Sequence, residues 1–118
     1  MIEAACWSHA RRKFFVLADL AARASGKLRV IAPLAVEAVK RIDRIFDIER
    51  EINGRPAIER LAIRQDRSGP LVRELKEWMS KERARLSRHS DVANAMDYML
   101  KRWIAFTRFL DDGRVCLA

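Results

Sequence analysis

The sequence predicts an all-α fold, a bundle of four to five helices that forms a single domain over residues 1–118. Apolar residues recur at the spacing of a helix face in four stretches, and no stretch alternates apolar and polar residues over more than a few positions. The 118 residues include only 4 Gly and 3 Pro, half of the residues are hydrophobic and 34% are charged. This composition is typical of a helix-rich protein with a buried core, and the length is that of one domain.

The first predicted helix covers residues 5 to 22 and ends near Arg23. Its apolar stripe consists of Trp7, Ala10, Phe14, Leu17, Ala18 and Ala21. The small and basic stretch Ala24-Ser25-Gly26-Lys27 follows, and such residues favour a connection over a continued helix.

The second predicted helix has Pro33 in its first turn, where the missing backbone donor of proline costs nothing. Its apolar face consists of Val39, Ile42, Ile45, Phe46 and Ile52. Glu37 and Arg41 are four residues apart and can form an ion pair on this helix. Asn53-Gly54 ends the helix, because these two residue types adopt a positive φ with the least steric penalty.

The third helical pattern starts at Pro56 and is interrupted at Ser68-Gly69-Pro70. Its apolar residues are Ile58, Leu61 and Ala62 before the interruption and Leu71, Leu75, Trp78, Met79 and Leu86 after it. Proline lacks a backbone donor and crowds the preceding turn. The pattern therefore predicts a kink or a break, not one straight helix from 57 to 86.

The last predicted helix starts after Ser90, a favourable N-cap residue, and has Asp91 at its positive end. Its apolar stripe consists of Val92, Met96, Met99, Leu100, Trp103, Phe106, Thr107 and Leu110. Asp112-Gly113 ends this helix. The aromatic residues expected to anchor the core, and not to stack on bases, are Trp78, Trp103, Phe106 and Phe109. The short connections predict antiparallel neighbouring helices.

The chain carries a strong excess of positive charge. Its 24 Lys and Arg outnumber 16 Asp and Glu, which gives a formal net charge of +8 and a pI near 10.3. Such a charge attracts nucleic acid, although a solvated charged surface is the alternative interpretation. No apolar run approaches the roughly 20 residues that cross a membrane, and the N-terminus lacks a secretory-signal pattern. We therefore expect a cytoplasmic protein with no membrane partner, no small-molecule substrate, and reduced Cys6 and Cys116.

Two groups of cations are the candidate DNA-binding residues. The first group is Arg11, Arg12 and Lys13, and the second is Lys81, Arg83, Arg85 and Arg88, with His89 beside it. A helix spreads three adjacent residues over more than half of its circumference, so at least two cations of the first group should be exposed. Lysine and arginine neutralise phosphates without reading base sequence. An ordinary solvated helix surface is the alternative for both groups.

Metal binding and catalysis have weaker candidates. The two Cys and two His form a numerically complete zinc-ligand set: Cys6, His9, His89 and Cys116. Only Cys6 and His9 are close in sequence, so we expect no metal site and regard them as the only candidate zinc ligands. Asp111 and Asp112 could pair at a metal, yet they also fit a helix end before Gly113. The sequence has no Ser/His/Asp set, phosphate-binding loop or His-Glu-x-x-His motif, so we expect no catalytic residue and no cofactor.

Five stretches together carry a resemblance to a known family. They are Cys6-Trp7-Ser8-His9-Ala10-Arg11-Arg12-Lys13-Phe14-Phe15, Arg41-Ile42-Asp43, Ile48-Glu49-Arg50-Glu51-Ile52-Asn53-Gly54, Arg64-Gln65 and the run from Trp103 to Arg114. With them the chain resembles transposases of the bacterial insertion sequence 66 family, over essentially all 118 residues.

The resemblance implies a DDE recombinase, in which three carboxylates and two divalent metal ions catalyse phosphoryl transfer. Two catalytic aspartates would lie upstream of the Cys-x-x-His pair, and a catalytic glutamate beyond Asp111-Asp112-Gly113-Arg114. The chain would then be the helical insertion between them, and its Cys-x-x-His pair would help to hold the catalytic core together. Its first residues would leave a strand of the catalytic sheet, so a short strand around residues 3 to 7 is the alternative to a helical start. We therefore expect a segment of a transposase, engineered or from a truncated gene, that is inactive alone. Magnesium is implied only for the full-length enzyme.

The resemblance also sets the expected partners. We expect weak, non-specific DNA binding, association with the bacterial nucleoid when bound, and a role in transposition and DNA recombination through the parent enzyme. We expect self-association, because Phe15, Val16 and Leu20 lie off the main stripe of the first helix. The alternatives are a self-standing nucleic-acid-binding module and a helical protein-interaction module whose basic surface is incidental.

Overall fold

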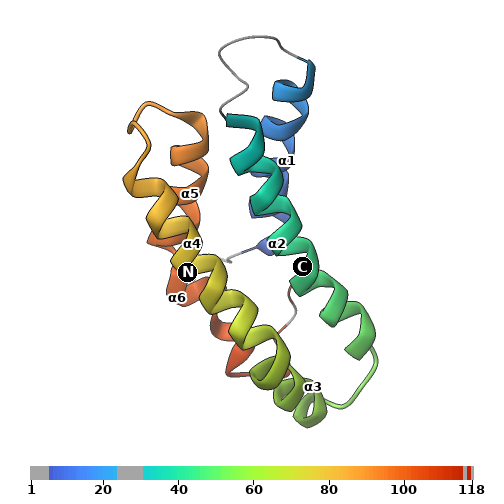
Figure 1. The fold of residues 1–118 in the computed structure, drawn as a ribbon. Coiled ribbons are helices and arrows are strands. Elements are labelled where there is room, and N and C mark those ends of the chain that lie inside the picture. The colour runs from blue at the N-terminus through green and yellow to red at the C-terminus, as the bar shows by residue number, and fades with distance from the viewer. Residues whose placement is uncertain (1–5, 24–30, 116, 118) are drawn as a thin grey trace.

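The computed structural model describes residues 6–23, 31–115 and 117, and these residues form helices and turns without a strand (Figure 1). The α-helices are α1 (Trp7–Arg23), α2 (Ile31–Ile52), α3 (Ala57–Ile63), α4 (Gly69–Ala84), α5 (Asp91–Lys101) and α6 (Trp103–Phe106). A π-helical segment, Arg64–Ser68, joins α3 to α4, and a 3-10 turn, Arg108–Leu110, follows α6. The prediction of an all-α bundle is confirmed. The alternative of a strand at residues 3 to 7 falls mostly outside the described residues.

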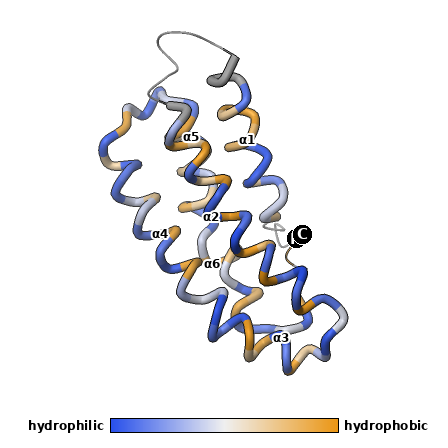
Figure 2. The backbone as a smooth tube through the Cα atoms, turned by 45° about the vertical axis from the view of Figure 1, so that its right-hand side comes forward, coloured by the Kyte–Doolittle hydropathy of each residue, from blue (hydrophilic) through white to orange (hydrophobic). Residues whose placement is uncertain are grey.

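The helices form two antiparallel pairs that lie side by side (Figure 1). In one pair α1 packs along α2, and in the other α4 packs along α5. Contacts of α1 with α5 and of α2 with α4 join the two pairs. Hydrophobic and hydrophilic residues alternate along each helix at short intervals (Figure 2), which is the amphipathic pattern that such packing requires.

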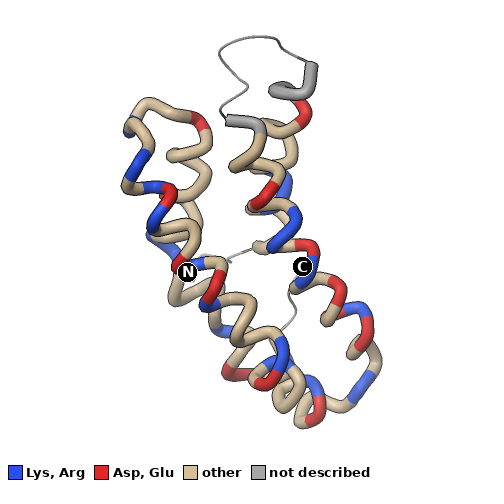
Figure 3. The backbone as a smooth tube through the Cα atoms, in the orientation of Figure 1, with Lys and Arg blue, Asp and Glu red and all other residues tan. Residues whose placement is uncertain are grey.

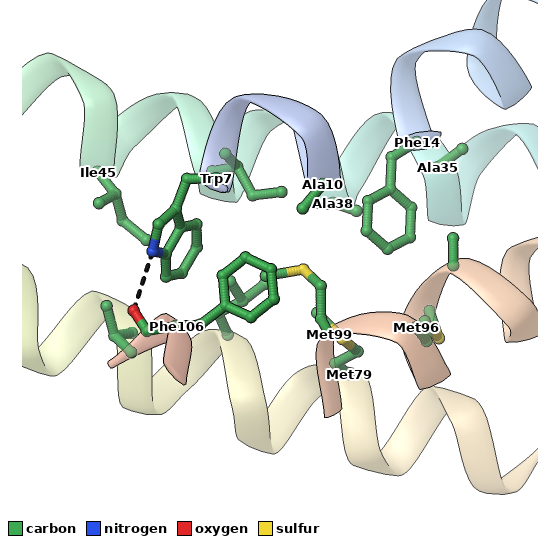
Figure 4. Close-up of a cluster of buried hydrophobic side chains, with 14 of the residues drawn as sticks. Trp7, Ala10, Phe14, Ala35, Ala38, Ile45, Met79, Met96, Met99 and Phe106 are labelled. Carbon is green, nitrogen blue, oxygen red and sulfur yellow. Dashed lines mark hydrogen bonds between the residues drawn. The ribbon is translucent and has the colours of Figure 1, made fainter. Parts of the chain in front are cut away.

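Trp7 is the residue through which the N-terminal helix joins the C-terminal one. Its indole Nε1 donates a hydrogen bond to the carbonyl oxygen of Phe106 at 3.0 Å (Figure 4). Its ring makes edge-to-face contacts with Phe106 and Phe109, with centroid distances of 5.3 and 5.7 Å. Both phenylalanines are buried, and Trp78 and Trp103 are half-buried against the core. The prediction that these four aromatic residues anchor the core is confirmed.

The boundaries of the first two helices follow the prediction. Pro33 is the third residue of α2, and α2 ends at Ile52. Gly54 then adopts a φ of +88°, a left-handed conformation that glycine tolerates without a Cβ penalty. Ser90 also has its predicted role, because its Oγ accepts a hydrogen bond from the backbone N–H of Ala93 at the start of α5.

Helical structure continues through the proline at position 70, as a widened turn. The backbone N–H of Gly69 donates to the carbonyl of Arg64, five residues earlier, and this bond defines a π-helical turn. A regular turn would place the ring of Pro70 against the carbonyl of Asp66. The wider π-helical turn leaves room for that ring. We predicted a kink or a break at this position, and the helix is distorted but not broken.

The prediction of one helix from Ser90 to Asp112 is wrong, because the helix breaks at Arg102. Arg102 has a φ of −111° and a ψ of 20°, and its backbone N–H bonds to Met99, three residues earlier. The carbonyl of Tyr98 thereby loses the donor that a continuous helix supplies. The Nη1 atom of Arg102 replaces this donor at 3.2 Å. Beyond this break, the carbonyl of Phe106 accepts the hydrogen bond from the indole of Trp7.

Candidate nucleic-acid interface

The three adjacent cations of α1 have three different environments. Arg11 turns toward α2, where its Nε lies 2.5 Å from Oδ1 of Asp43, and this hydrogen bond raises the pKa of Arg11 despite partial desolvation. Arg12 is exposed to solvent. Lys13 is half-buried, with its Nζ 4.8 Å from the centroid of the Tyr98 ring on α5. The structure therefore does not place the three cations in one patch.

The second predicted group lies at the end of α4, and its members also differ. Arg83 makes a two-pronged ion pair with Asp97 of α5, at 2.8 and 3.2 Å, and only 23% of its side chain is exposed. Lys81 lies 3.5 Å from Glu77 and is well exposed. Arg85 lies 4.0 Å from an oxygen of Glu82 with 79% of its side chain exposed, and Arg88 is also exposed. Arg83 is thus a packing residue between α4 and α5, while the other three remain accessible.

A depression of about 440 Å³ lies at the break between α5 and α6. Four cations line it, together with the half-buried Trp103 and the exposed Ile104; the cations are Lys76, Lys101, Arg102 and Arg108. None of the described residues that line this α5–α6 depression is acidic. We did not predict this site, because these cations lie on two separate segments and Trp103 fitted the apolar stripe of a continuous helix. The adjacent cations before Trp103 were the available signal.

Tyr98 connects this depression to the cations of α1. The guanidinium carbon of Arg102 lies 4.4 Å from the centroid of the Tyr98 ring, and Lys13 lies over the same ring. A second depression between α1 and α5 contains Arg12, Lys13, His9 and one acid, Asp91. We call the surface that runs over these two depressions the basic face; its cations are Arg12, Lys13, Lys76, Lys101, Arg102 and Arg108.

The surface of α2 has a different charge pattern. Acidic and basic residues alternate along this helix (Figure 3). Its acids pair with cations within the helix and on neighbouring elements, in the pairs Glu37 with Arg41, Asp43 with Arg11, Asp47 with Arg50, Glu49 with Arg64 and Glu51 with Arg67. Residues 98–110, by contrast, contain three cations and no acid. The excess positive charge is therefore uneven: on the basic face, Lys76, Lys101 and Arg108 have no ion-pair partner among the described residues.

A buried arginine holds the C-terminal part of the described chain in place. Arg64 is 2% exposed and makes a two-pronged ion pair with Glu49, at 2.7 and 3.0 Å. Its Nη1 also donates to the carbonyls of Phe109 and Asp112, at 3.2 and 3.1 Å. Each of the three guanidinium nitrogens therefore has an acceptor, which burial of an arginine requires.

Two neighbours of Arg64 bind the same segment. Gln65 donates to the carbonyl of Leu110 at 3.2 Å, and Arg60 donates to the carbonyl of Gly113 at 2.9 Å. Gly113 is buried so closely that a Cβ atom there would lie 1.9 Å from the carbonyl oxygen of Ala57. We call Arg60, Arg64 and Gln65 the carbonyl clamp. Close packing therefore requires glycine at position 113. We had predicted only that this glycine helps to end the helix.

The candidate metal ligands do not converge within the part of the chain that the structure describes. No group of three or more His, Cys, Asp or Glu side chains is arranged to hold a metal ion there. His9 is exposed and contacts the edge of the Tyr98 ring at 5.6 Å, and Cys6 is a half-buried free cysteine. Cys116 lies outside the described residues. The Asp112 carboxylate accepts hydrogen bonds from the side chain and backbone of Arg114, which lower the pKa of Asp112.

Both ends of the described chain approach the same part of α2. Ser8 lies beside Phe46 and Arg50 in one depression, and Val115 and Leu117 lie beside the same two residues in another. Leu117 is buried in the core. The chain thus enters and leaves the helical bundle against one stretch of one helix.

No helix in the described ranges is long and apolar enough to span a membrane.

The sequence comparison decides the family. The model of the IS66 transposase family matches residues 1–118. The chain belongs to this family. Family membership confirms the resemblance on which the functional expectations rest, and it covers the segments that carry the basic face and the carbonyl clamp.

Three relatives from Sinorhizobium fredii (strain NBRC 101917 / NGR234) match nearly the whole chain. The uncharacterized protein y4hP is 57% identical over 115 residues, which are 95% of this chain and 21% of that protein. The uncharacterized proteins y4jD and y4qI are 37% and 35% identical, over 93% and 95% of this chain and 20% and 19% of their own lengths. The chain therefore spans about a fifth of the length of these relatives. No solved structure matches.

Proposed function

We propose that this chain is a helical accessory region of an IS66-family transposase, which binds DNA through its phosphates and is catalytically inactive alone. The observation that carries the DNA-binding part is the basic face, where cations from α1, α4, α5 and the turn after α6 line two depressions whose described lining residues include one acid, Asp91. Phosphate contacts of this kind supply affinity without base recognition. The expected binding is therefore weak and insensitive to sequence.

The place of the region in its parent protein is part of the proposal. The relatives are about five times as long as this chain, and the bundle is entered and left at one stretch of α2. That geometry suits a helical unit inserted between two segments of a larger domain. The catalytic carboxylates and their divalent metal ions would then belong to the parent protein outside this region.

The carbonyl clamp has a role in the same proposal. It binds the backbone from Phe109 to Gly113. This stretch overlaps Asp111-Asp112-Gly113-Arg114, the segment that the family resemblance places before the catalytic glutamate. A backbone held at four carbonyls has little freedom to change direction. We infer that the clamp sets the path along which the chain leaves the bundle toward the active site of the parent enzyme.

The test is a fluorescence-anisotropy titration of labelled duplex DNA at several salt concentrations. The slope of log K against log salt should be about −0.9 for each phosphate neutralised. The double variant Arg12→Ala/Lys13→Ala should make this slope shallower by about two contacts, or roughly 1.8. Arg11 is left unchanged because it pairs with Asp43. The control Lys40→Ala/Arg44→Ala removes the same charge from exposed positions of α2 and should leave the slope almost unchanged.

A second function, protein–protein interaction, has its own supporting observation. Phe15 and Val16 are 49% and 47% exposed on α1. Leu20, the third residue of the predicted self-association surface, has a side chain outside the described set. An exposed apolar pair of this kind is a typical contact between protein molecules. If this were the only function, duplex DNA would bind negligibly near physiological salt, and the basic variants would have no effect.

A further inference from the structure

The α5–α6 depression exists because the helix breaks at Arg102. The break turns the chain so that Lys101 and Arg108 both line the same hollow, and α4 contributes Lys76. All three of these side chains are exposed, and none forms an ion pair with another described residue. Arg102 is held differently, against Tyr98. Three accessible cations therefore line a hollow in which no described lining residue is acidic.

Concentrated like charges repel one another, so this arrangement costs free energy unless an anion occupies the hollow. The ion pairs of Arg41, Arg50 and Arg64 with acids of α2 show how the same chain compensates some of its other cations. Three cations that come from two separate segments of the chain suit several phosphates in a row better than one small anion. The charge pattern therefore favours a polyanion with regularly spaced phosphates.

Ile104 adds an apolar component to this site. It is 80% exposed beside Lys101 and Arg108, over a wall that includes the half-buried Trp103. A phosphate gains nothing from contact with an isoleucine. The deoxyribose between two phosphates of a nucleic-acid strand has an apolar edge that such a side chain can cover.

We propose that the α5–α6 depression is a binding site for the backbone of DNA, in which Lys76, Lys101 and Arg108 neutralise phosphates and Ile104 packs on the sugar between them. This inference rests on the proposed DNA-binding function and assigns its main contact surface. The site reads no base, and it accepts the backbone of a duplex.

The first test removes the three cations with Lys76→Ala/Lys101→Ala/Arg108→Ala. Binding of a labelled duplex should weaken by about tenfold or more, and the salt slope should become shallower by roughly two to three contacts. The matched control is Lys40→Ala/Arg44→Ala/Arg55→Ala, which removes the same charge from exposed residues on α2 and its following turn. The control should weaken binding less than about twofold. Far-UV circular dichroism of both variants establishes that they are folded.

The second test separates the apolar contact from charge. Ile104→Ser should weaken duplex binding by about three- to tenfold, because apolar surface is no longer covered, and should leave the salt slope unchanged. Ile58→Ser is the control, because Ile58 is 79% exposed on α3, away from the depression. It should leave the affinity unchanged. Equal effects of the two isoleucine substitutions would overturn the assignment of Ile104.

The outcomes distinguish this inference from the proposed function. If the unmodified chain does not bind duplex DNA at all, both fail. If it binds, and the Lys76/Lys101/Arg108 variant keeps the original affinity and salt slope while Arg12→Ala/Lys13→Ala changes them, the α5–α6 site is refuted and DNA binding stands. A single-stranded oligonucleotide bound in preference to the duplex, with the preference lost in Ile104→Ser, would also refute a backbone-only site.

Discussion

Replacing Arg64 by methionine should destabilise the protein more than any other single charge removal at its surface or interior. The substitution keeps an unbranched side chain of similar length and removes the guanidinium. It leaves the Glu49 carboxylate, 14% exposed, without its partner, and it leaves the carbonyls of Phe109 and Asp112 without their Arg64 donors. The structural consequence is a buried charge and buried acceptors that water reaches poorly.

The size of the effect follows from this burial. Breaking a buried ion pair by removing one partner costs about 3 to 5 kcal/mol of the free energy of unfolding. Because Glu49 keeps some contact with solvent, we expect the lower end, about 3 kcal/mol. For a chain of this size, that loss lowers the melting temperature by roughly 12 °C. Urea denaturation followed by far-UV circular dichroism measures the free energy directly.

The chain supplies a matched control in the next ion pair along the same two segments. Arg67 pairs with Glu51, but their side chains are 48% and 58% exposed, so Arg67→Met should cost less than about 0.5 kcal/mol. The double variant Glu49→Leu/Arg64→Met should recover part of the loss, because no uncompensated charge remains. A cost of less than about 1 kcal/mol for Arg64→Met, similar to that of Arg67→Met, would refute the reasoning.

Three further predictions concern packing, titration and assembly. Gly113→Ala should cost more than about 2 kcal/mol of stability, since its Cβ would meet the Ala57 carbonyl at 1.9 Å; equilibrium unfolding measures this, and a neutral substitution would contradict it. Arg114→Ala should raise the pKa of Asp112 toward its usual value in an NMR titration. Because folding lowers this pKa, the stabilisation by Asp112 should be present above the unfolded-state pKa and lost as pH falls through the folded-state one; an unchanged pKa in the variant would count against the contact. Light scattering should detect self-association that Phe15→Ser/Val16→Ser reduces, whereas a strict 13.7 kDa monomer at high concentration would exclude it.

Most of the helical architecture could be predicted from local sequence. The apolar stripe of α2, its proline in the first turn and Gly54 after its end are signals carried by the residues that form the element. The break at Arg102 is different. The Phe106 carbonyl beyond the break accepts a hydrogen bond from Trp7, which is 99 residues away in the sequence, and no local pattern records such a contact. The apolar residues on both sides of the break fit the stripe of a continuous helix equally well.

The candidate site was harder to predict than the fold for a related reason. Composition indicated an interaction with polyanions, but the position of each cation depends on which acids lie nearby in space. Arg11 and Arg83 have carboxylates of other helices beside them, Asp43 and Asp97, and pairings of this kind cannot be read from spacing along one helix. The cations of the α5–α6 depression come together only through the break at Arg102.

The role of the carbonyl clamp could not be predicted from the sequence either. Arg64-Gln65 carried the family resemblance, but periodicity alone treats a charged residue as part of a solvated helix face. Burial of Arg64 requires acceptors from α2 and from the C-terminal segment at once. Only the tertiary arrangement provides all of them, so the role of this residue emerges from the structure.

The measurement that most directly tests the central claim is an NMR titration of the isotope-labelled chain with duplex DNA. We predict that backbone amide shifts change mainly on the basic face, around Arg12 and Lys13 and from Lys101 to Arg108, and that the changes diminish as salt is added. Amides around Lys40 and Arg44 of α2 should change little. Shift changes centred on α2, or no change at a DNA concentration that saturates the anisotropy signal, would contradict the account.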